Sequence, residues 1–171
     1  MGSNSDVARE IWVPSRTSQA GAGTVTVGTF ATIDGIPIYK FDTITIRIVH
    51  ATPLAGGGTL DLYFQKAVAF VAATLLPDPT DDTHWHDYAR NTQVLTTMND
   101  VIELGTGRPV GPSNPSQLAT SGGAKDLRAI TGGDAARGTH WGDRLRLQEV
   151  VAGTITQAAI YSVFATGVIV N

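Results

Sequence analysis

The feature that most constrains the fold is a strict alternation of apolar and polar residues in three separate segments. Residues 41–51 read FDTITIRIVHA, with an isoleucine at every second position, and residues 59–66 and 143–151 repeat the pattern with leucine and phenylalanine. A period of two residues places successive side chains on opposite faces of a strand. We therefore expect three strands, each with one buried and one solvated face.

The alternation also predicts which side chains face the core. The inward residues are expected to be Ile44, Ile46 and Ile48, then Leu60, Leu62 and Phe64, and finally Leu145 and Leu147. The solvated residues are expected to be Thr43, Thr45 and Arg47, then Asp61, Tyr63 and Gln65, and finally Arg144, Arg146 and Gln148.

Glycine, proline and asparagine residues separate the predicted strands in the rest of the chain. The sequence TPLAGGG at 52–58 predicts a hairpin that spans 41–66, with a long glycine loop. Residues 64–76 fit either a strand that runs on or a short helix, and β-branched residues followed by PDP favour the strand. A Gly/Pro/Ser/Thr-rich segment at 105–125 predicts a long loop of the functional or mobile kind.

These patterns give about eight strands with turns between them, without the alternation of strands and helices that a parallel sheet requires. The predicted fold is therefore all-β: an antiparallel β-sandwich over residues 23–171, with a jelly roll as the favoured variant. Residues 1–22 are polar except for an apolar island and predict an extended N-terminal arm. Within that island, Ile11 and Trp12 are the expected anchors on the domain or on a neighbouring chain.

The composition of the chain argues against several classes of function. Charged residues make up 16% of the 171 residues, below the roughly 25% of typical soluble domains, which suits a chain whose surface is covered by neighbours. A net charge of −3 without a basic cluster argues against binding to nucleic acid. The absence of cysteine excludes disulfides and thiolate sites. The apolar runs at 67–76 and 158–170 are too short or too polar to span a bilayer, so we expect a soluble protein made in the cytoplasm.

The sequence DDTHWHDY at 81–88 is the sharpest polar cluster. Its carboxylates and imidazoles are possible metal ligands, contributed by Asp81, Asp82, His84, His86 and Asp87, with His50 and His140 able to join only through folding. An H-x-H pair without a specific third ligand is weak evidence, and a polar turn with inward aromatic residues explains the cluster better. We therefore expect no metal and no cofactor.

Catalytic patterns are equally weak. Neither G-x-S-x-G nor S-x-x-K occurs, and the serines within 113–121 lie in the predicted loop. The scattered carboxylates of Asp61, Asp87, Asp143 and Glu149 could in principle form a glycosidase pair, but all except Asp87 lie beside or inside strand patterns, where an outward carboxylate is usually a solvated face. We therefore expect that the chain is not an enzyme. Exposed aromatic residues such as Tyr63 or Trp141 are candidate sugar-stacking or interaction residues.

Four short sequence segments, in this order along the chain, resemble the pattern of a known protein family. They are GGGTLDLYFQ at 56–65, HWHDYARNTQV at 84–94, WGDRLRLQEVVAGT at 141–154 and the alternating last strand. Together they resemble small β-sandwich virion proteins of tailed bacteriophages and related prophage elements. The residues that match the family pattern are Thr59, Leu60, Asp61, Tyr63 and Gln65, then Trp85, Asp87 and Ala89, then Gly142, Asp143, Arg144 and Arg146, and finally Gly153, Thr154 and Phe164. The chain departs from that pattern by inserting KAVAFVAATLLPDPT at 66–80 and by its loop at 105–125.

The resemblance implies a structural virion protein, foremost a capsid decoration (cement) protein that binds and stabilises the head lattice. The alternatives are a tail, baseplate or head-fibre component, or a glycan-binding adhesion module. The implied partners are the major capsid protein or other virion proteins and further copies of the chain, as a trimer or a pentamer. Neither nucleic acid nor membrane is an expected partner.

Overall fold

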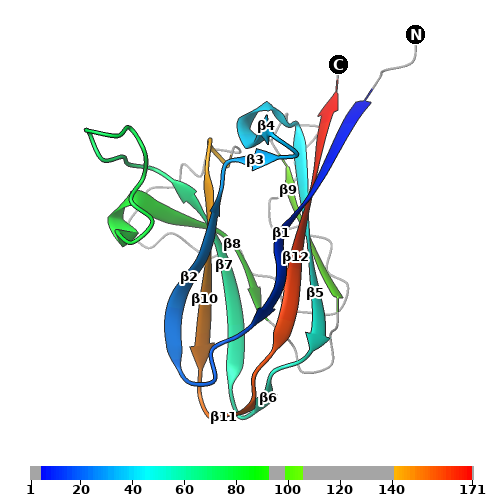
Figure 1. The fold of residues 1–171 in the computed structure, drawn as a ribbon, viewed down its shortest axis with the longest axis vertical. Coiled ribbons are helices and arrows are strands. Elements are labelled where there is room, and N and C mark those ends of the chain that lie inside the picture. The colour runs from blue at the N-terminus through cyan, green and yellow to red at the C-terminus, as the bar shows by residue number, and fades with distance from the viewer. Residues whose placement is uncertain (1–4, 93–98, 106–140, 171) are drawn as a thin grey trace, which may run out of the picture.

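The computed structural model describes residues 5–92, 99–105 and 141–170, and over these residues the chain is all-β and antiparallel (Figure 1). The long strands are β1 (Ser5–Thr17), β2 (Gly23–Phe30), β5 (Thr43–Thr52), β7 (Thr59–Ala67), β8 (Trp85–Thr92), β9 (Asn99–Gly105), β10 (Leu145–Ala152) and β12 (Ile160–Val170). The short elements are β3 (Thr32–Ile33), β4 (Ile36–Pro37), β6 (Ala55–Gly56), β11 (Ile155–Gln157) and the 3-10 turns η1 (Ile38–Lys40) and η2 (Asp82–His84).

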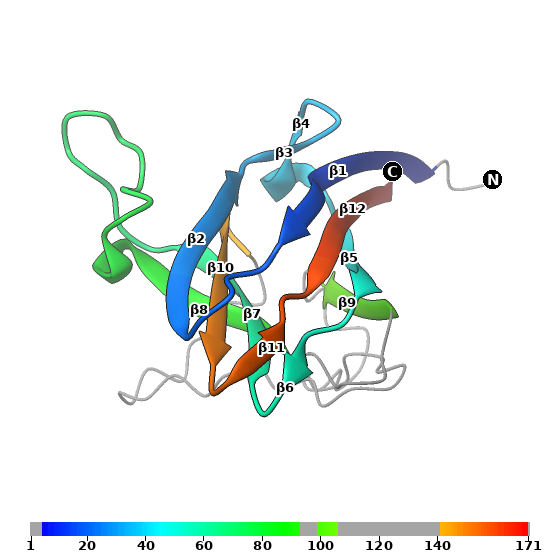
Figure 2. The ribbon, with the colours of Figure 1, turned by 60° about the horizontal axis from the view of Figure 1, so that its bottom comes forward.

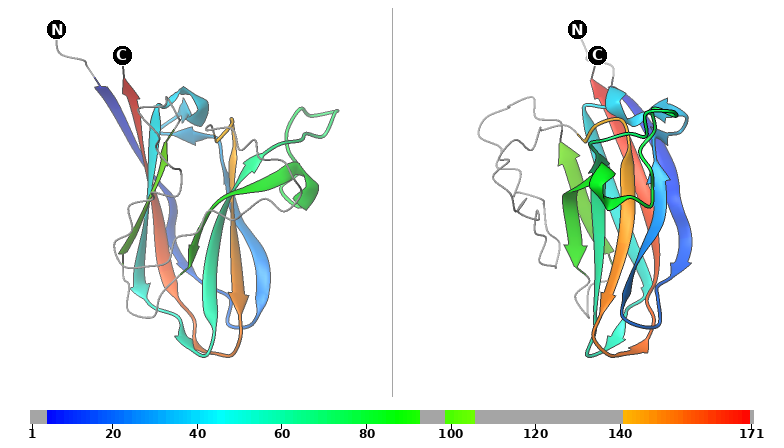
Figure 3. Two further views of the ribbon diagram at one scale, coloured as in Figure 1. Left: turned by 180° about the vertical axis from the view of Figure 1, so that it is seen from behind. Right: turned by 90° about the vertical axis from the view of Figure 1, so that its left-hand side faces the viewer.

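Two four-stranded sheets face each other across one core. Sheet A has the order β1-β12-β5-β9, and sheet B has the order β2-β10-β7-β8. The pairs β6–β11 and β3–β4 lie at opposite ends of this body (Figures 1 and 3). The predicted inward residues of all three alternating segments are fully buried in the shared core, so that prediction is confirmed: Ile44, Ile46 and Ile48; Leu60, Leu62 and Phe64; Leu145 and Leu147.

The predicted hairpin over 41–66 is wrong. Strand β5 pairs with β12 and β9 in sheet A, whereas β7 pairs with β10 and β8 in sheet B. The chain crosses between the sheets through β6 and the glycines at 56–58. Gly56 has a φ of 112°, which L side chains rarely adopt, and an added Cβ would lie 2.5 Å from the carbonyl oxygen of Thr154. The glycine run therefore serves a crossover between sheets.

The predicted N-terminal arm is also wrong for the residues that the structure describes. Residues 5–17 are β1, an edge strand paired antiparallel with β12 from Ser5↔Val170 to Thr17↔Ile160. Trp12 and Val13 belong to the core, and the Trp12 ring stacks on Phe30 with centroids 4.5 Å apart. The apolar island thus anchors β1 to its own domain.

Two further predictions concern segments near β7 and β9. The strand expected to run through 64–76 ends at Ala67. Residues 68–70 have no regular structure, and 72–75 form a turn closed by the isolated bridge Val71↔Leu76, so the segment continues neither as a strand nor as a helix. The predicted strand at 85–98 is confirmed as β8 as far as Thr92, and 93–98 lie outside the described residues. The predicted loop at 105–125 also lies outside them, except for Gly105, the last residue of β9.

A glycine in β12 gives the first testable prediction. A Cβ added to Gly167 would lie 2.7 Å from Cγ of the buried Phe41 ring and closer still to two other ring atoms. Gly167→Ala should therefore lower the free energy of unfolding by about 1–3 kcal/mol through overpacking. Urea denaturation measures this loss. The control is Gly21→Ala, where the added Cβ meets nothing within 4 Å; equal stability of the two variants would contradict the packing described for β12.

Candidate interaction site

The chain between β7 and β8, residues 68–84, projects from sheet B on the side away from sheet A (Figures 1 and 2). We call it the excursion. The Val68 amide donates to the carbonyl oxygen of His84 at 2.9 Å, which closes its base. The amides of Val71 and Leu75 donate to the carbonyl oxygens of Leu76 and Val71, each at 2.9 Å, and close its far end into a turn. The projection therefore has a defined backbone.

The apolar tip of the excursion, residues 68–76, contains no charged residue. Its large side chains face solvent, with exposed fractions of 38% for Val68, 50% for Phe70, 38% for Val71, 74% for Leu75 and 45% for Leu76. Leu75 also has a φ of 55°. A leucine in this left-handed region costs roughly 1–3 kcal/mol, and such residues cluster at functional sites. The tip thus presents apolar side chains on a strained, defined turn.

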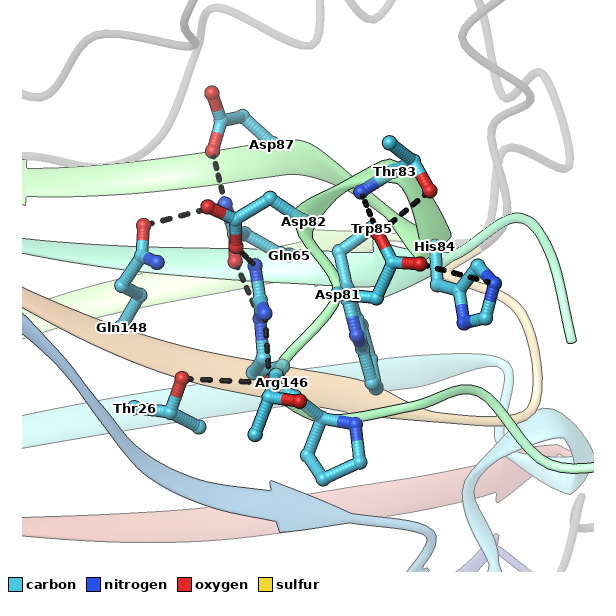
Figure 4. A network of polar contacts seen from close by, with 12 residues as sticks. Thr26, Gln65, Asp81, Asp82, Thr83, His84, Trp85, Asp87, Arg146 and Gln148 are labelled. Atoms are coloured by element: carbon cyan, nitrogen blue, oxygen red, sulfur yellow. Dashed lines mark hydrogen bonds and ion pairs between the residues drawn. The ribbon is translucent and has the colours of Figure 1, made fainter. Parts of the chain in front are cut away.

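Arg146 fixes the base of the excursion to sheet B (Figure 4). Its guanidinium is 1% exposed and donates to Gln65 Oε1 at 2.7 Å, to the carbonyl oxygen of Pro79 at 2.8 Å and to Asp82 Oδ1 at 2.6 Å. It also lies over the Trp85 ring, 5.1 Å from the centroid. Because Pro79 and Asp82 belong to the excursion and Gln65 to β7, one side chain joins the two.

The prediction that Arg146, Gln65 and Tyr63 lie on a solvated face is wrong. They do lie on the face of the sheet opposite Leu62 and Leu147, but all three are buried. Gln65 also connects Arg146 to β8, because Gln65 Nε2 donates to Asp87 Oδ1 at 2.7 Å. The excursion covers part of this outer face, which is why an alternating strand has both sides buried.

Two aspartate turns shape the excursion next to its base. Asp78 Oδ1 accepts from the amide and hydroxyl of Thr80 at 2.8 and 2.7 Å, and Asp81 Oδ1 accepts likewise from Thr83 at 2.9 and 2.6 Å. These hydrogen bonds favour the charged carboxylates, so they lower the pKa of Asp78 and Asp81 below the ordinary value of 3.8. With Asp82, which is ion-paired with Arg146, these residues form an acidic segment between the tip and β8 that we call the acidic collar.

The two turns should loosen on acidification. A carboxylate with a lowered pKa in the folded state stabilises that state above pH 3.8 and stops doing so as the pH falls through the folded value. The amide NMR shifts of Thr80 and Thr83 should therefore titrate with midpoints below 3.8. In Thr80→Val and Thr83→Val variants the corresponding aspartate should titrate closer to that value. Wild-type midpoints above 3.8 would contradict the hydrogen bonds described.

In the structure, residues of the predicted metal cluster make hydrogen bonds and an ion pair with other groups. His84 Nδ1 accepts from the Asp78 amide at 2.9 Å, Asp82 binds Arg146, and Asp87 binds Gln65. The segment is not extended before Trp85, because η2 turns it. Within 5–92, 99–105 and 141–170, the histidines and carboxylates form no group of three or more that could hold a metal ion. His140 and the serines within 113–121 lie outside these ranges.

The four predicted interaction residues do not come together. Ile11 is 53% exposed on β1, but Trp12 is buried and its Nε1 donates to the carbonyl oxygen of Thr32 at 3.2 Å. Trp141 is fully buried, with its Nε1 2.9 Å from the carbonyl oxygen of Ile38, and Tyr63 is 8% exposed. The two aromatic rings proposed to stack on sugars are therefore not available at the surface.

A second buried ionic cluster lies between the sheets around Glu149, which was expected on a solvated face. Its side chain is fully buried and accepts from Arg16 Nε at 2.9 Å, from the Gln19 amide at 2.9 Å and from the Tyr161 hydroxyl at 2.7 Å. Burial, and then the hydrogen bond to Glu149, raise the pKa of Tyr161. The cluster ties the end of β1 and the following turn to β10 and β12.

Sequence reasoning missed the two residues that define this site, Leu75 and Arg146. The signals were present: an uncharged apolar run in an insertion, followed by an aspartate-rich turn, and an arginine in an alternating strand. The chain matches no protein-family model, and no curated protein is significantly similar to it. Over the described residues, the structure contains no helix with the length and hydrophobicity needed to cross a membrane.

Proposed function

We propose that this chain is a non-enzymatic structural protein of a tailed-phage particle, within that class a decoration protein that binds the capsid. The observation that carries the proposal is the strand order. Numbered along the chain, the eight long strands form the sheets 1-8-3-6 and 2-7-4-5. The pairs 1-8, 2-7, 3-6 and 4-5 are those of one long hairpin, and rolling it up adds 8-3 and 7-4. This order supports a jelly-roll sandwich, an architecture that viral capsid proteins and lectins use.

Architecture alone does not assign function, so the surface decides between these classes. A lectin that stacks sugars needs accessible aromatic rings, and burial of Tyr63 and Trp141 weighs against those two residues in that role. The hydrogen-bonded excursion with its exposed apolar tip instead favours contact with another folded protein.

In the proposed mechanism, the two sheets form a rigid body and surface elements bind neighbouring subunits. A decoration protein that binds only the assembled lattice stabilises that lattice by mass action. Each contact should bury about 1,000 Å² or more in total. An apolar tip on an immobilised turn contributes to such a contact at low entropic cost, because its backbone is already ordered.

The test is to look for the chain in gradient-purified particles of the phage that encodes it. Peptide mass spectrometry should find it in the particles, and immunogold labelling should place it on the head. Label confined to the tail would overturn the decoration role, and absence of the chain from particles would overturn the virion role altogether. Wild-type chain added back to particles that lack it should raise their melting temperature.

A further inference from the structure

The inference concerns two surfaces that lie on opposite sides of the molecule. The first is the excursion, with its apolar tip at 68–76 and its acidic collar of Asp78, Asp81 and Asp82. In Figures 1 and 3 the excursion leaves from sheet B, away from sheet A. Asp82 is ion-paired with Arg146, so the negative charge of the collar at neutral pH comes from the carboxylates of Asp78 and Asp81.

The second surface is the outer side of sheet A. Val7, Arg9 and Ile11 alternate on β1 and are exposed, and the pairing with β12 places Val168, Thr166 and Phe164 beside them. The next strand places Arg47 beside Phe164. We call this surface the receptor face, and it consists of Val7, Arg9, Ile11, Arg47, Phe164 and Val168. Its apolar residues are accompanied by the exposed Arg9 and by Arg47, which already has an interaction within the chain.

The two surfaces are complementary. The tip offers leucine, phenylalanine and valine, and the carboxylates of Asp78 and Asp81 follow it along the excursion. The receptor face offers valine, isoleucine and phenylalanine beside the positive charge of the exposed Arg9. We propose that the apolar tip of one chain binds the receptor face of a second copy, head to tail. The core separates the two surfaces within one chain, so the contact must join different chains. A head-to-tail contact generates a closed ring, or a filament where the rotation does not close.

This inference rests on the proposed function and names one of its neighbouring subunits, a second copy of the chain. The strain at Leu75 supports it, because a 74%-exposed leucine in the left-handed region contributes little to the stability of a lone chain. The charge pairing further predicts that association weakens with added salt, as expected for partly exposed charges.

Two variants separate the surfaces. The tip variant, Phe70→Ser/Leu75→Asn, removes the two most exposed large side chains of the tip, and asparagine tolerates the left-handed backbone at 75. The face variant, Val7→Thr/Arg9→Glu, keeps a β-branched residue on β1 but reverses the charge. The control is Tyr39→Ser, which alters an exposed aromatic residue on η1, outside both surfaces.

Sedimentation equilibrium over a micromolar-to-millimolar series is the measurement. Wild type and Tyr39→Ser should associate, and each surface variant alone should associate about thirtyfold or more weakly, the effect of losing one hot spot. A one-to-one mixture of the two surface variants should form a dimer, because each supplies the surface that the other lacks.

Three results would overturn the inference: a monomeric wild type, an unimpaired face variant, or a mixture that stays monomeric. Binding of a monomeric wild type to phosphatidylcholine vesicles, lost in the tip variant, would assign the tip to lipid instead. Sedimentation equilibrium measures association of the chain in solution and does not depend on the phage particle. Association in solution without particle binding would leave the contact intact and remove only the virion role.

Discussion

Replacing Arg146 with methionine should release the excursion from sheet B while the core stays folded. The variant leaves Gln65 Oε1 without this donor and the Pro79 carbonyl oxygen with only the 3.5 Å hydrogen bond from the Thr26 hydroxyl, frees Asp82 and loses the contact with the Trp85 ring. A hydrogen bond from a charged donor contributes about 1.5–3 kcal/mol, so local opening of the excursion should become easier by about 3 kcal/mol. Hydrogen exchange at the Val68 amide, which closes the base, should accelerate by about a hundredfold or more.

Two controls make the Arg146 experiment specific. Arg146→Lys keeps the charge but not the planar fork, so it should restore less than half of the lost protection. Arg144→Met removes a neighbouring arginine that does not contact the excursion in the hydrogen bonds described and whose ion pair with Asp143 is 3.9 Å long, and it should change the exchange at Val68 little. Unchanged exchange at Val68 in Arg146→Met would show that the excursion is held by something else.

Replacing Arg16 with methionine should destabilise the whole domain, and more strongly. Glu149 would keep its charge in the core without its cation, and breaking a buried ion pair from one side costs about 3–5 kcal/mol. We expect a loss near the lower end, because the Arg16 side chain is 28% exposed. Urea denaturation monitored by tryptophan fluorescence measures the loss.

The matched variants for Arg16 test the charge argument itself. Arg16→Met/Glu149→Gln removes the buried charge, keeps an acceptor oxygen for the Gln19 amide and offers an amide N–H to the Tyr161 hydroxyl oxygen, so it should be more stable than Arg16→Met alone. Arg9→Met, an exposed arginine on the same strand, should stay within about 0.5 kcal/mol of wild type. A double variant less stable than the single one would contradict an uncompensated carboxylate as the cause.

The sequence was sufficient to predict each strand's inward face, because a two-residue period is a local property. Ile46, Leu62 and Leu147 lie in the core as the alternation predicted. Pairing between strands depends on distant segments, and this is where prediction failed. The glycine loop at 52–58 suggested a hairpin, but the chain uses those glycines to pass from sheet A to sheet B.

Burial of the polar residues could not be predicted for the same reason. Alternation placed Arg146 on the outer face of β10 correctly, but the cover over it comes from Pro79 and Asp82, far away in the chain. Glu149 shares the inward side with Leu147, and its partners Arg16 and Tyr161 lie on strands of the other sheet. A local pattern marks a charged residue as solvated unless its partner is known.

The candidate site was only partly visible in the sequence. In the sequence the insertion at 66–80 departs from the resembled family, and its β-branched residues favour a continuing strand. The structure instead places Phe70 and Leu75 on an exposed turn. Whether an apolar run is exposed depends on the folded chain, so the periodicity of the sequence cannot predict it.

The central claim is that this domain works by seating its excursion on a neighbouring protein subunit. The most direct measurement is a cryo-electron microscopy reconstruction of gradient-purified particles that carry the chain. The account predicts two facing four-stranded sheets on the particle, with Leu75 buried against an adjoining subunit. A bound chain whose excursion points into solvent at every copy would contradict it.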